Sequence, residues 1–158
     1  MKTKIIFLTI LSLSFINCKQ AVKEDTKSPG TNLTKTASGS EQHLNTSWIE
    51  EMSLNNGTKW EANLETTSGV ADMAKLVAET KTISVEDYRN LGNGLNGVKN
   101  NIVKECTMTG ASHDNLHVFL HPLIQKIELL QKTDDTETGA KIKESINGHL
   151  KSYYTYFD

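Results

Sequence analysis

The sequence predicts an all-α fold, an up-down-up-down four-helix bundle preceded by a disordered tether. From residue 59 onward the apolar residues recur every three or four positions, which is the spacing of one face of an α-helix. No segment alternates apolar and polar residues with the period of two that marks a half-buried strand. Four amphipathic segments of about 20 residues, joined by short loops, are typical of an up-and-down bundle.

Residues 1–17 predict an export signal rather than a part of the fold. Two lysines precede an apolar run from Ile5 to Ile16, which is shorter than the roughly 20 apolar residues of a membrane-spanning helix. The run leads into Phe-Ile-Asn-Cys at residues 15–18. This tetrapeptide resembles the lipobox of bacterial lipoproteins, although the box prefers Leu at its first position and a small residue before the cysteine. We therefore expect Cys18 to be lipidated, with secretion and cleavage nearby as the alternative.

Residues 18–58 are predicted to form the lipidated N-terminus and a flexible tether. Up to about residue 45 they are rich in Lys, Ser, Thr and Gly, and such a composition buries too little apolar surface to fold. A small apolar island follows and predicts a short helix laid on the bundle; it consists of Trp48, Ile49, Met52 and Leu54. Asn55-Asn56-Gly57 then predicts a turn.

Residues 59–158 are predicted to be the bundle, and its first two helices follow from the apolar stripes. The first spans about 59–80, with inward positions Leu64, Val70, Met73, Ala74 and Val77. The second opens at Ser84, where Ser84 and Asp87 form a variant of the capping box. Its stripe is Tyr88, Leu91, Leu95, Val98 and Ile102.

The third and fourth helices carry stripes with the same spacing. The third spans about 112–131, with Leu116, Leu120, Leu123, Ile127 and Leu130 inward. The fourth spans about 136–157, with Ile142, Ile146, Leu150, Tyr153 and Phe157 inward. About 100 residues of this kind form one domain with a workable core.

The charge of the chain argues against nucleic acid as a partner. Of 17 basic and 19 acidic residues, removal of residues 1–17 takes two lysines and no acid, which leaves a net charge of −4. Arg89 is the only arginine. Such a chain lacks the basic surface that binds phosphate backbones.

The stretch from Glu105 to His121, ECTMTGASHDNLHVFLH, gathers soft and nitrogen donors within seventeen residues. It holds Cys106, Met108 and three of the five histidines. If Cys18 is lipidated, Cys106 has no partner for an internal disulfide and becomes a candidate ligand or reactive thiol. Antiparallel connections bring the end of the second helix, the start of the third, Trp60 and the tyrosines at 153, 154 and 156 to one end of the bundle.

Helical geometry indicates which donors converge there. At about 100° per residue, His113 lies on the inner stripe of the third helix and His117 on its flank, while His121 has turned toward solvent. Cys106 continues the inner face of the second helix, and Met108 falls in the turn. We therefore expect a metal site formed by Cys106, Met108, His113 and His117.

The donor types favour copper. Thiolate, thioether and imidazole together select Cu(I). A coordination shell that used the Asp114 carboxylate instead of the Met108 thioether would resemble a zinc site. The bundle would then buffer, sense or hand over the ion, with a metal-transport or metal-acceptor protein as its partner. A structural reading stays open beside this one, because a buried free cysteine often serves as a small apolar residue.

The same residues carry a resemblance. Glu105-Cys106-Thr107-Met108-x-Gly110-x-x-His113-x-x-Leu116-His117, with Trp60 and two threonines upstream, resembles a group of uncharacterised bacterial lipoproteins with an ECTM-x-G-x-x-H-x-x-LH signature. The resemblance covers about residues 59–131. It implies a small helical exported domain with a preserved Cys/Met/His set at Cys106, Met108, His113 and His117. The expected lipidation separately predicts a protein anchored in the bacterial cell envelope and facing the periplasm or the exterior. The resemblance implies no activity.

Three other functions are weighed against metal binding. A haem-binding bundle would use Met73 and His149, but antiparallel packing places them at different levels. A non-catalytic interaction module with a structural Cys/His cluster is the main alternative. An enzyme is not expected, because no third orienting group accompanies Cys106 and His113, and His149 is interpreted as a solvated helix residue.

Overall fold

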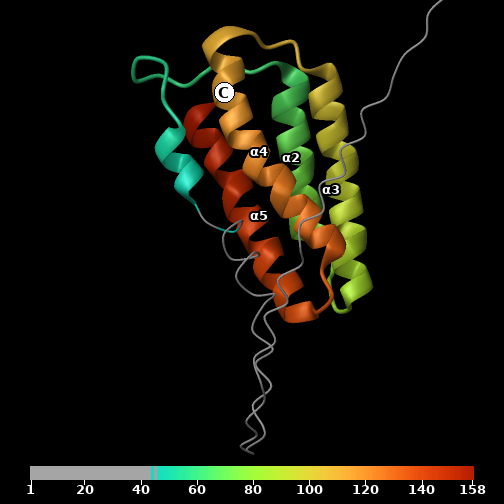
Figure 1. The fold of residues 1–158 in the computed structure, drawn as a ribbon. Coiled ribbons are helices and arrows are strands. Elements are labelled where there is room, and N and C mark those ends of the chain that lie inside the picture. Colours follow the sequence, from blue (N-terminus) through green and yellow to red (C-terminus); the bar gives the residue numbers. More distant parts are fainter. Residues whose placement is uncertain (1–43, 45) are drawn as a thin grey trace, which may run out of the picture. The chain divides into compact units, whose positions relative to one another are not determined.

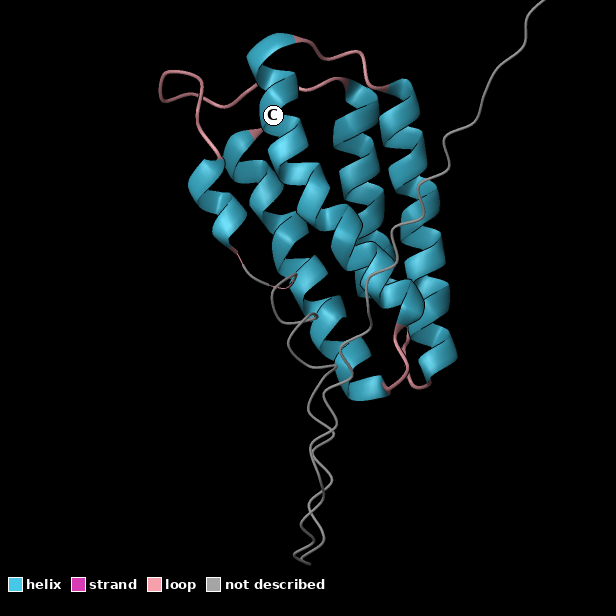
Figure 2. Cartoon of the chain, viewed as in Figure 1, coloured by secondary structure: helices cyan, strands magenta, loops and turns pink. Residues whose placement is uncertain are grey.

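The structure is a computed structural model that describes residue 44 and residues 46–158. The expected export signal at 1–17, the lipidation site Cys18 and the tether up to residue 43 lie outside the described residues. The described part contains a short 3-10 helix and four long α-helices (Figures 1 and 2). Their bounds are η1 Ser47–Glu51, α2 Leu64–Glu79, α3 Val85–Glu105, α4 Gly110–Lys132 and α5 Thr136–Tyr156. None of these helices has the length and apolar character needed to cross a bilayer.

The four long helices form the predicted bundle. Each helix packs against the next in the chain, and α5 packs back on α2 to close the ring (Figure 1). The connections between them are short, as an antiparallel order requires. The all-α, up-down-up-down architecture is therefore confirmed.

The helix boundaries follow local capping chemistry. The Ser84 hydroxyl accepts a hydrogen bond from the Asp87 amide at 3.2 Å, and the Asp87 carboxylate accepts one from the Ser84 amide at 2.8 Å. This is the predicted capping box, which satisfies amides that a helix start leaves without partners. At the start of α4, Gly110 has a φ of 65°, a left-handed conformation that glycine adopts without the strain of a side chain.

The core follows the predicted stripes closely. All five inward positions of α4 and all five of α5 are buried, and in α3 only Val98 is partly exposed. Leu64 was wrongly placed inward, since its side chain is 76% exposed. The prediction placed Leu64 inside a helix that began near residue 59. In the structure α2 begins at Leu64, so this side chain belongs to the first residue of the helix and reaches solvent at the end of the bundle.

Residues 46–60 precede the first long helix and contact α4 and α5 through η1, Ser53 and Trp60. The first part of the apolar island, Trp48 and Ile49, lies in η1, whereas Met52 and Leu54 follow it, and Trp48 is buried in the same core as the bundle. The predicted turn is present, because Asn55 and Thr58 exchange backbone hydrogen bonds of 2.8 and 3.0 Å. Asn56 and Gly57 have φ values of 52° and 89°, the pair of positive φ angles of a type I′ turn.

One terminus of each long helix lies at the same end of the bundle. The Trp60 amide donates to the Tyr156 carbonyl at 2.8 Å, and the Asp158 amide donates to the Trp60 carbonyl at 3.0 Å. The Asn63 side-chain amide donates to the Glu105 carbonyl at 3.1 Å. The start of α2, the end of α3 and the end of α5 therefore surround the link to α4, as the sequence predicts.

Candidate metal centre

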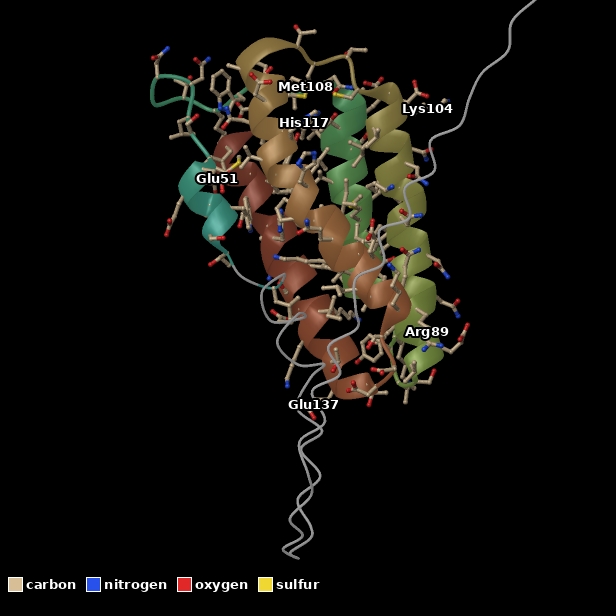
Figure 3. The ribbon with its side chains drawn as sticks, viewed as in Figure 1. Glu51, Arg89, Lys104, Met108, His117 and Glu137 are labelled. Atoms are coloured by element: carbon tan, nitrogen blue, oxygen red, sulfur yellow. The ribbon has the colours of Figure 1, made fainter. Side chains whose placement is uncertain are left out.

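The link between α3 and α4 places the sulfur donors. Cys106 is the C-cap residue that follows α3, and residues 106–109 carry no regular secondary structure before α4 begins at Gly110. His113 lies in the first turn of α4. Figure 3 shows Met108 and His117 at the same end of the bundle as Lys104, far from Arg89 and Glu137 at the other end. The predicted donors thus share one end.

Cys106 and His113 face each other directly. The thiol Sγ lies 3.7 Å from His113 Nδ1. With metal–sulfur and metal–nitrogen bonds of about 2.3 and 2.05 Å, two ligands of one tetrahedral ion stand about 3.6 Å apart, and two ligands of a trigonal ion about 3.8 Å apart. The pair already has the spacing that a shared ion imposes.

The three histidines of α4 form a row along the helix. The ring centroids of His113 and His117 are 4.3 Å apart, and those of His117 and His121 are 5.3 Å apart. His113 is half-buried, while His117 and His121 are exposed. The predicted decrease in burial along the row is therefore present, but His121 is not isolated, because its ring lies beside that of His117.

The other candidate donors are less closely engaged. Met108 is half-buried and packs against the apolar core, whereas Asp114 is exposed. Among the described residues, no three His, Cys, Asp or Glu side chains are placed to hold an ion as they stand. A shell of three or four donors at this end therefore requires either the Met108 thioether or a reorientation of His117.

Tyr153 is a buried phenol at the end of α5, near the end of the bundle that carries Cys106. Its hydroxyl lies 2.9 Å from the Thr67 hydroxyl, which also donates to the Asp158 carbonyl at 3.2 Å. Burial raises the pKa of Tyr153 above its usual value, and the charges of Tyr154, Asp158 and Cys106 add to this effect against the opposing hydrogen bond from Thr67. The phenol thus stays neutral and lies within electrostatic reach of the Cys106 thiol.

The loop before α2 is fastened to the start of α4 by contacts that sequence reasoning missed. The Asn115 side-chain oxygen accepts from the Ser53 amide at 3.0 Å and from its hydroxyl at 3.2 Å. The Asn115 amide donates to the Ala111 carbonyl at 2.9 Å. The Trp60 indole donates to the Ser53 carbonyl at 2.7 Å. These bonds hold the first turn of α4, and hence His113, in place.

His149 is not the solvated residue that the sequence suggested. It is 2% exposed, and its ring is stacked on Trp48 with centroids 4.0 Å apart and planes 12° apart. His149 Nε2 lies 2.9 Å from the Phe119 carbonyl and therefore donates to it, so Nδ1 is the acceptor of the Lys126 ammonium 3.2 Å away. The prediction failed because Trp48, from outside the bundle, covers this face of α5.

This buried pair affects the protonation of both partners. Burial and, to a smaller extent, the charge of Lys126 lower the pKa of His149 to about 3, against the opposing effect of the hydrogen bond to Phe119. Burial also lowers the pKa of Lys126 to about 8. Both ring nitrogens of His149 are engaged, so iron ligation by Met73 and His149 would require one of these hydrogen bonds to break.

Comparison of the chain with protein-family models, with curated proteins and with solved structures finds no match.

Proposed function

We propose that this is an exported, membrane-anchored protein that binds Cu(I) at one end of its bundle and buffers, senses or hands over the ion. Cys106, Met108, His113 and His117 supply the ligands. The observation that carries this proposal is the 3.7 Å approach of Cys106 Sγ to His113 Nδ1, the spacing of two donors around one ion. Lipidation at Cys18 would hold the protein on a bilayer of the bacterial cell envelope.

The remaining ligands can join this pair without unfolding a helix. Met108 lies in the link of residues 106–109, where no helical hydrogen bond limits a change of backbone angles. His117 stands one turn along α4 from His113, and rotation of an exposed side chain about its own bonds costs little. A soft thiolate and thioether beside imidazole favour Cu(I) over hard ions, and zinc is the alternative ion.

Partial exposure suits an ion that is passed on. Cys106 is half-buried and His117 is exposed, so a ligand from another protein can reach the ion while Cys106 still holds it. The proposed partner is accordingly a metal-transport or metal-acceptor protein. Such exchange needs a site with an accessible side, whereas a purely structural metal site is closed.

The test is a Cu(I) titration of the reduced chain against a competing chelator, in a Cys18→Ser background so that Cys106 is the only thiol. We expect one equivalent to bind. Cys106→Ala and His113→Ala should each weaken binding about 100-fold, because the gain from joining donors in one chelate is of that order or larger. His121→Ala should leave Cu(I) affinity within a few-fold of the parent.

Two results would redirect the proposal. Unchanged Cu(I) affinity in Cys106→Ala and His113→Ala would assign these residues to packing in a non-catalytic interaction module. Preferential binding of Zn²⁺, retained in Met108→Leu, would replace copper with zinc. The anchor is tested separately: Cys18→Ala should move the protein from the membrane to the soluble fraction, and unchanged membrane association would contradict lipidation at Cys18.

A further inference from the structure

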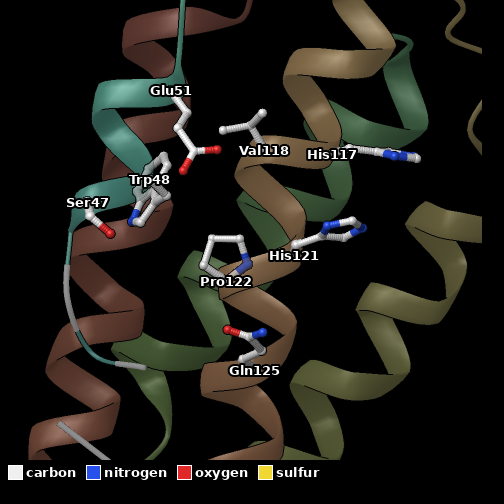
Figure 4. A pocket seen from close by; sticks show the side chains of 8 residues that line it. All are labelled: Ser47, Trp48, Glu51, His117, Val118, His121, Pro122 and Gln125. Atoms are coloured by element: carbon white, nitrogen blue, oxygen red, sulfur yellow. The ribbon is translucent and has the colours of Figure 1, made fainter. Parts of the chain in front are cut away.

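His117 and His121 stand together on the exposed side of α4. They are four residues apart on a continuous helix, both are exposed, and their ring centroids are 5.3 Å apart with the planes tilted by 33°. Figure 4 shows the two rings extending in the same direction from α4, whereas Glu51 and Trp48 lie on the other side of that helix. Residues spaced in this way occupy one helix face.

We propose that His117 and His121 form a second metal site, independent of the thiol, for a borderline divalent ion of the Cu(II) class. The donor set differs from that at the bundle end, because it contains two imidazoles and no sulfur. Imidazole suits Cu, Zn and Ni ions, and Cu(II) binds most strongly among the divalent ions of the first transition row. The soft donors that favour Cu(I) are absent from this pair.

The surroundings leave the rest of the coordination shell to water. Both histidines are exposed, and their rings extend away from the hollow that Trp48 and Glu51 border on the other side of α4, so bulk water has free access to the ring nitrogens (Figure 4). Glu51 is separated from the two rings by α4 and is not placed to be a ligand (Figure 4). Two protein ligands and water make an open, exchangeable site rather than a closed structural one.

The second site shares one ligand with the proposed Cu(I) site and otherwise stands apart from it. His117 lies between His113 and His121, with centroid distances of 4.3 and 5.3 Å. An ion held by His117 and His121 does not need Cys106, Met108 or His113. The inference therefore survives if Cu(I) binding fails, and the two sites are separated by testing Cu(II) in a protein without thiols.

The experiment uses the full chain with Cys18→Ser and Cys106→Ser, so that no thiol reduces the ion, and with His43→Ala to remove the histidine outside the bundle. Cu(II) is titrated against a competing chelator and followed by electron paramagnetic resonance. We expect one Cu(II) with two equivalent nitrogen ligands. The spectrum is a readout that a merely structural role of the histidines would not produce.

Variants at either end of the histidine row decide the assignment. In this background His121→Ala should weaken Cu(II) binding about 100-fold, because a chelating pair becomes a single ligand. His113→Ala, a matched change one turn before His117, should alter the affinity less than threefold. Equal affinity in His121→Ala and the parent would overturn the proposal, and so would an equal loss in His113→Ala. Because His121 is exposed, its replacement should leave the helical circular dichroism unchanged.

Discussion

Replacing the buried Lys126 with methionine tests the electrostatics of the core. Lys126 is 1% exposed, and the polar contact that its ammonium makes with a described residue is the 3.2 Å hydrogen bond to His149 Nδ1. Burying a charged ammonium is costly because the protein interior solvates it less well than water. Methionine has a similar length and no charge, so Lys126→Met removes this cost and keeps the packing.

The magnitude follows from the pKa. Burial lowers the pKa of Lys126 from 10.5 to about 8, so between pH 8 and 10.5 the unfolded chain binds more protons and stability rises with pH. At pH 7 both states are protonated, and the full cost of roughly 3 kcal/mol applies, at about 1.4 kcal/mol per pH unit of pKa difference. At pH 10 the Lys126 amine is neutral in the folded protein, and only about 1 kcal/mol of the burial cost remains.

The assay compares urea unfolding of the parent and Lys126→Met between pH 7 and pH 10. The parent should gain about 2 kcal/mol relative to the variant over this range. The variant also loses the hydrogen bond from Lys126 to His149. This loss changes the difference in unfolding free energy by the same amount at every pH from 7 to 10, because the pKa of His149 is about 3. Lys75→Met, at an exposed position of α2, is the control and should show no such trend. A difference between parent and Lys126→Met that is independent of pH would refute the reasoning.

Three further predictions concern stability, each measured as the free energy of unfolding in urea. Ser84→Ala removes the capping box of α3 and should cost about 1 kcal/mol; no loss would mean that the cap is dispensable. Gly139→Ala places a Cβ 2.7 Å from the ring of Tyr88 and should cost about 1–3 kcal/mol. Gly148→Ala, which meets nothing within 4 Å, should instead stabilise α5 by up to about 1 kcal/mol, and equal effects at the two glycines would be inconsistent with the packing. The pKa of His149 falls from 6.5 in the unfolded chain to about 3 in the folded protein. The stability that the neutral ring contributes is therefore fully present above pH 6.5 and is lost as the pH falls toward 3. Between pH 7 and 4 the parent should lose up to about 3 kcal/mol more than His149→Gln, and parallel acid curves would contradict this.

The helices could be predicted because their signals are local. The stripe in α4 and the capping box at Ser84 depend on residues within a few turns of one another, and both appear as expected. The start of α2 could not be located, because Trp60 is held in extended backbone by pairing with Phe157, a residue almost 100 positions later in the sequence. Leu64 is exposed for that reason.

Of the candidate site, the proximity of Cys106 and His113 was predictable, because it too follows from short-range connectivity. Chain connectivity brings Cys106 and His113 together, and the structure places them 3.7 Å apart. The Lys126–His149 pair could not be found, because its burial depends on Trp48, which comes from a segment outside the four amphipathic stripes. A polar residue on an apparently solvated face gives no local sign that a distant aromatic ring covers it.

X-ray absorption spectroscopy of the Cu(I)-loaded chain, in the Cys18→Ser background, tests the proposed site most directly. The proposed ligands predict a copper ion bound by both sulfur and imidazole nitrogen, with the thiolate sulfur lost in Cys106→Ser and one imidazole lost in His113→Ala. Met108→Leu should remove the remaining sulfur. A spectrum with nitrogen and oxygen ligands only, or one left unchanged by Cys106→Ser, would contradict the assignment of this bundle end as a Cu(I) site.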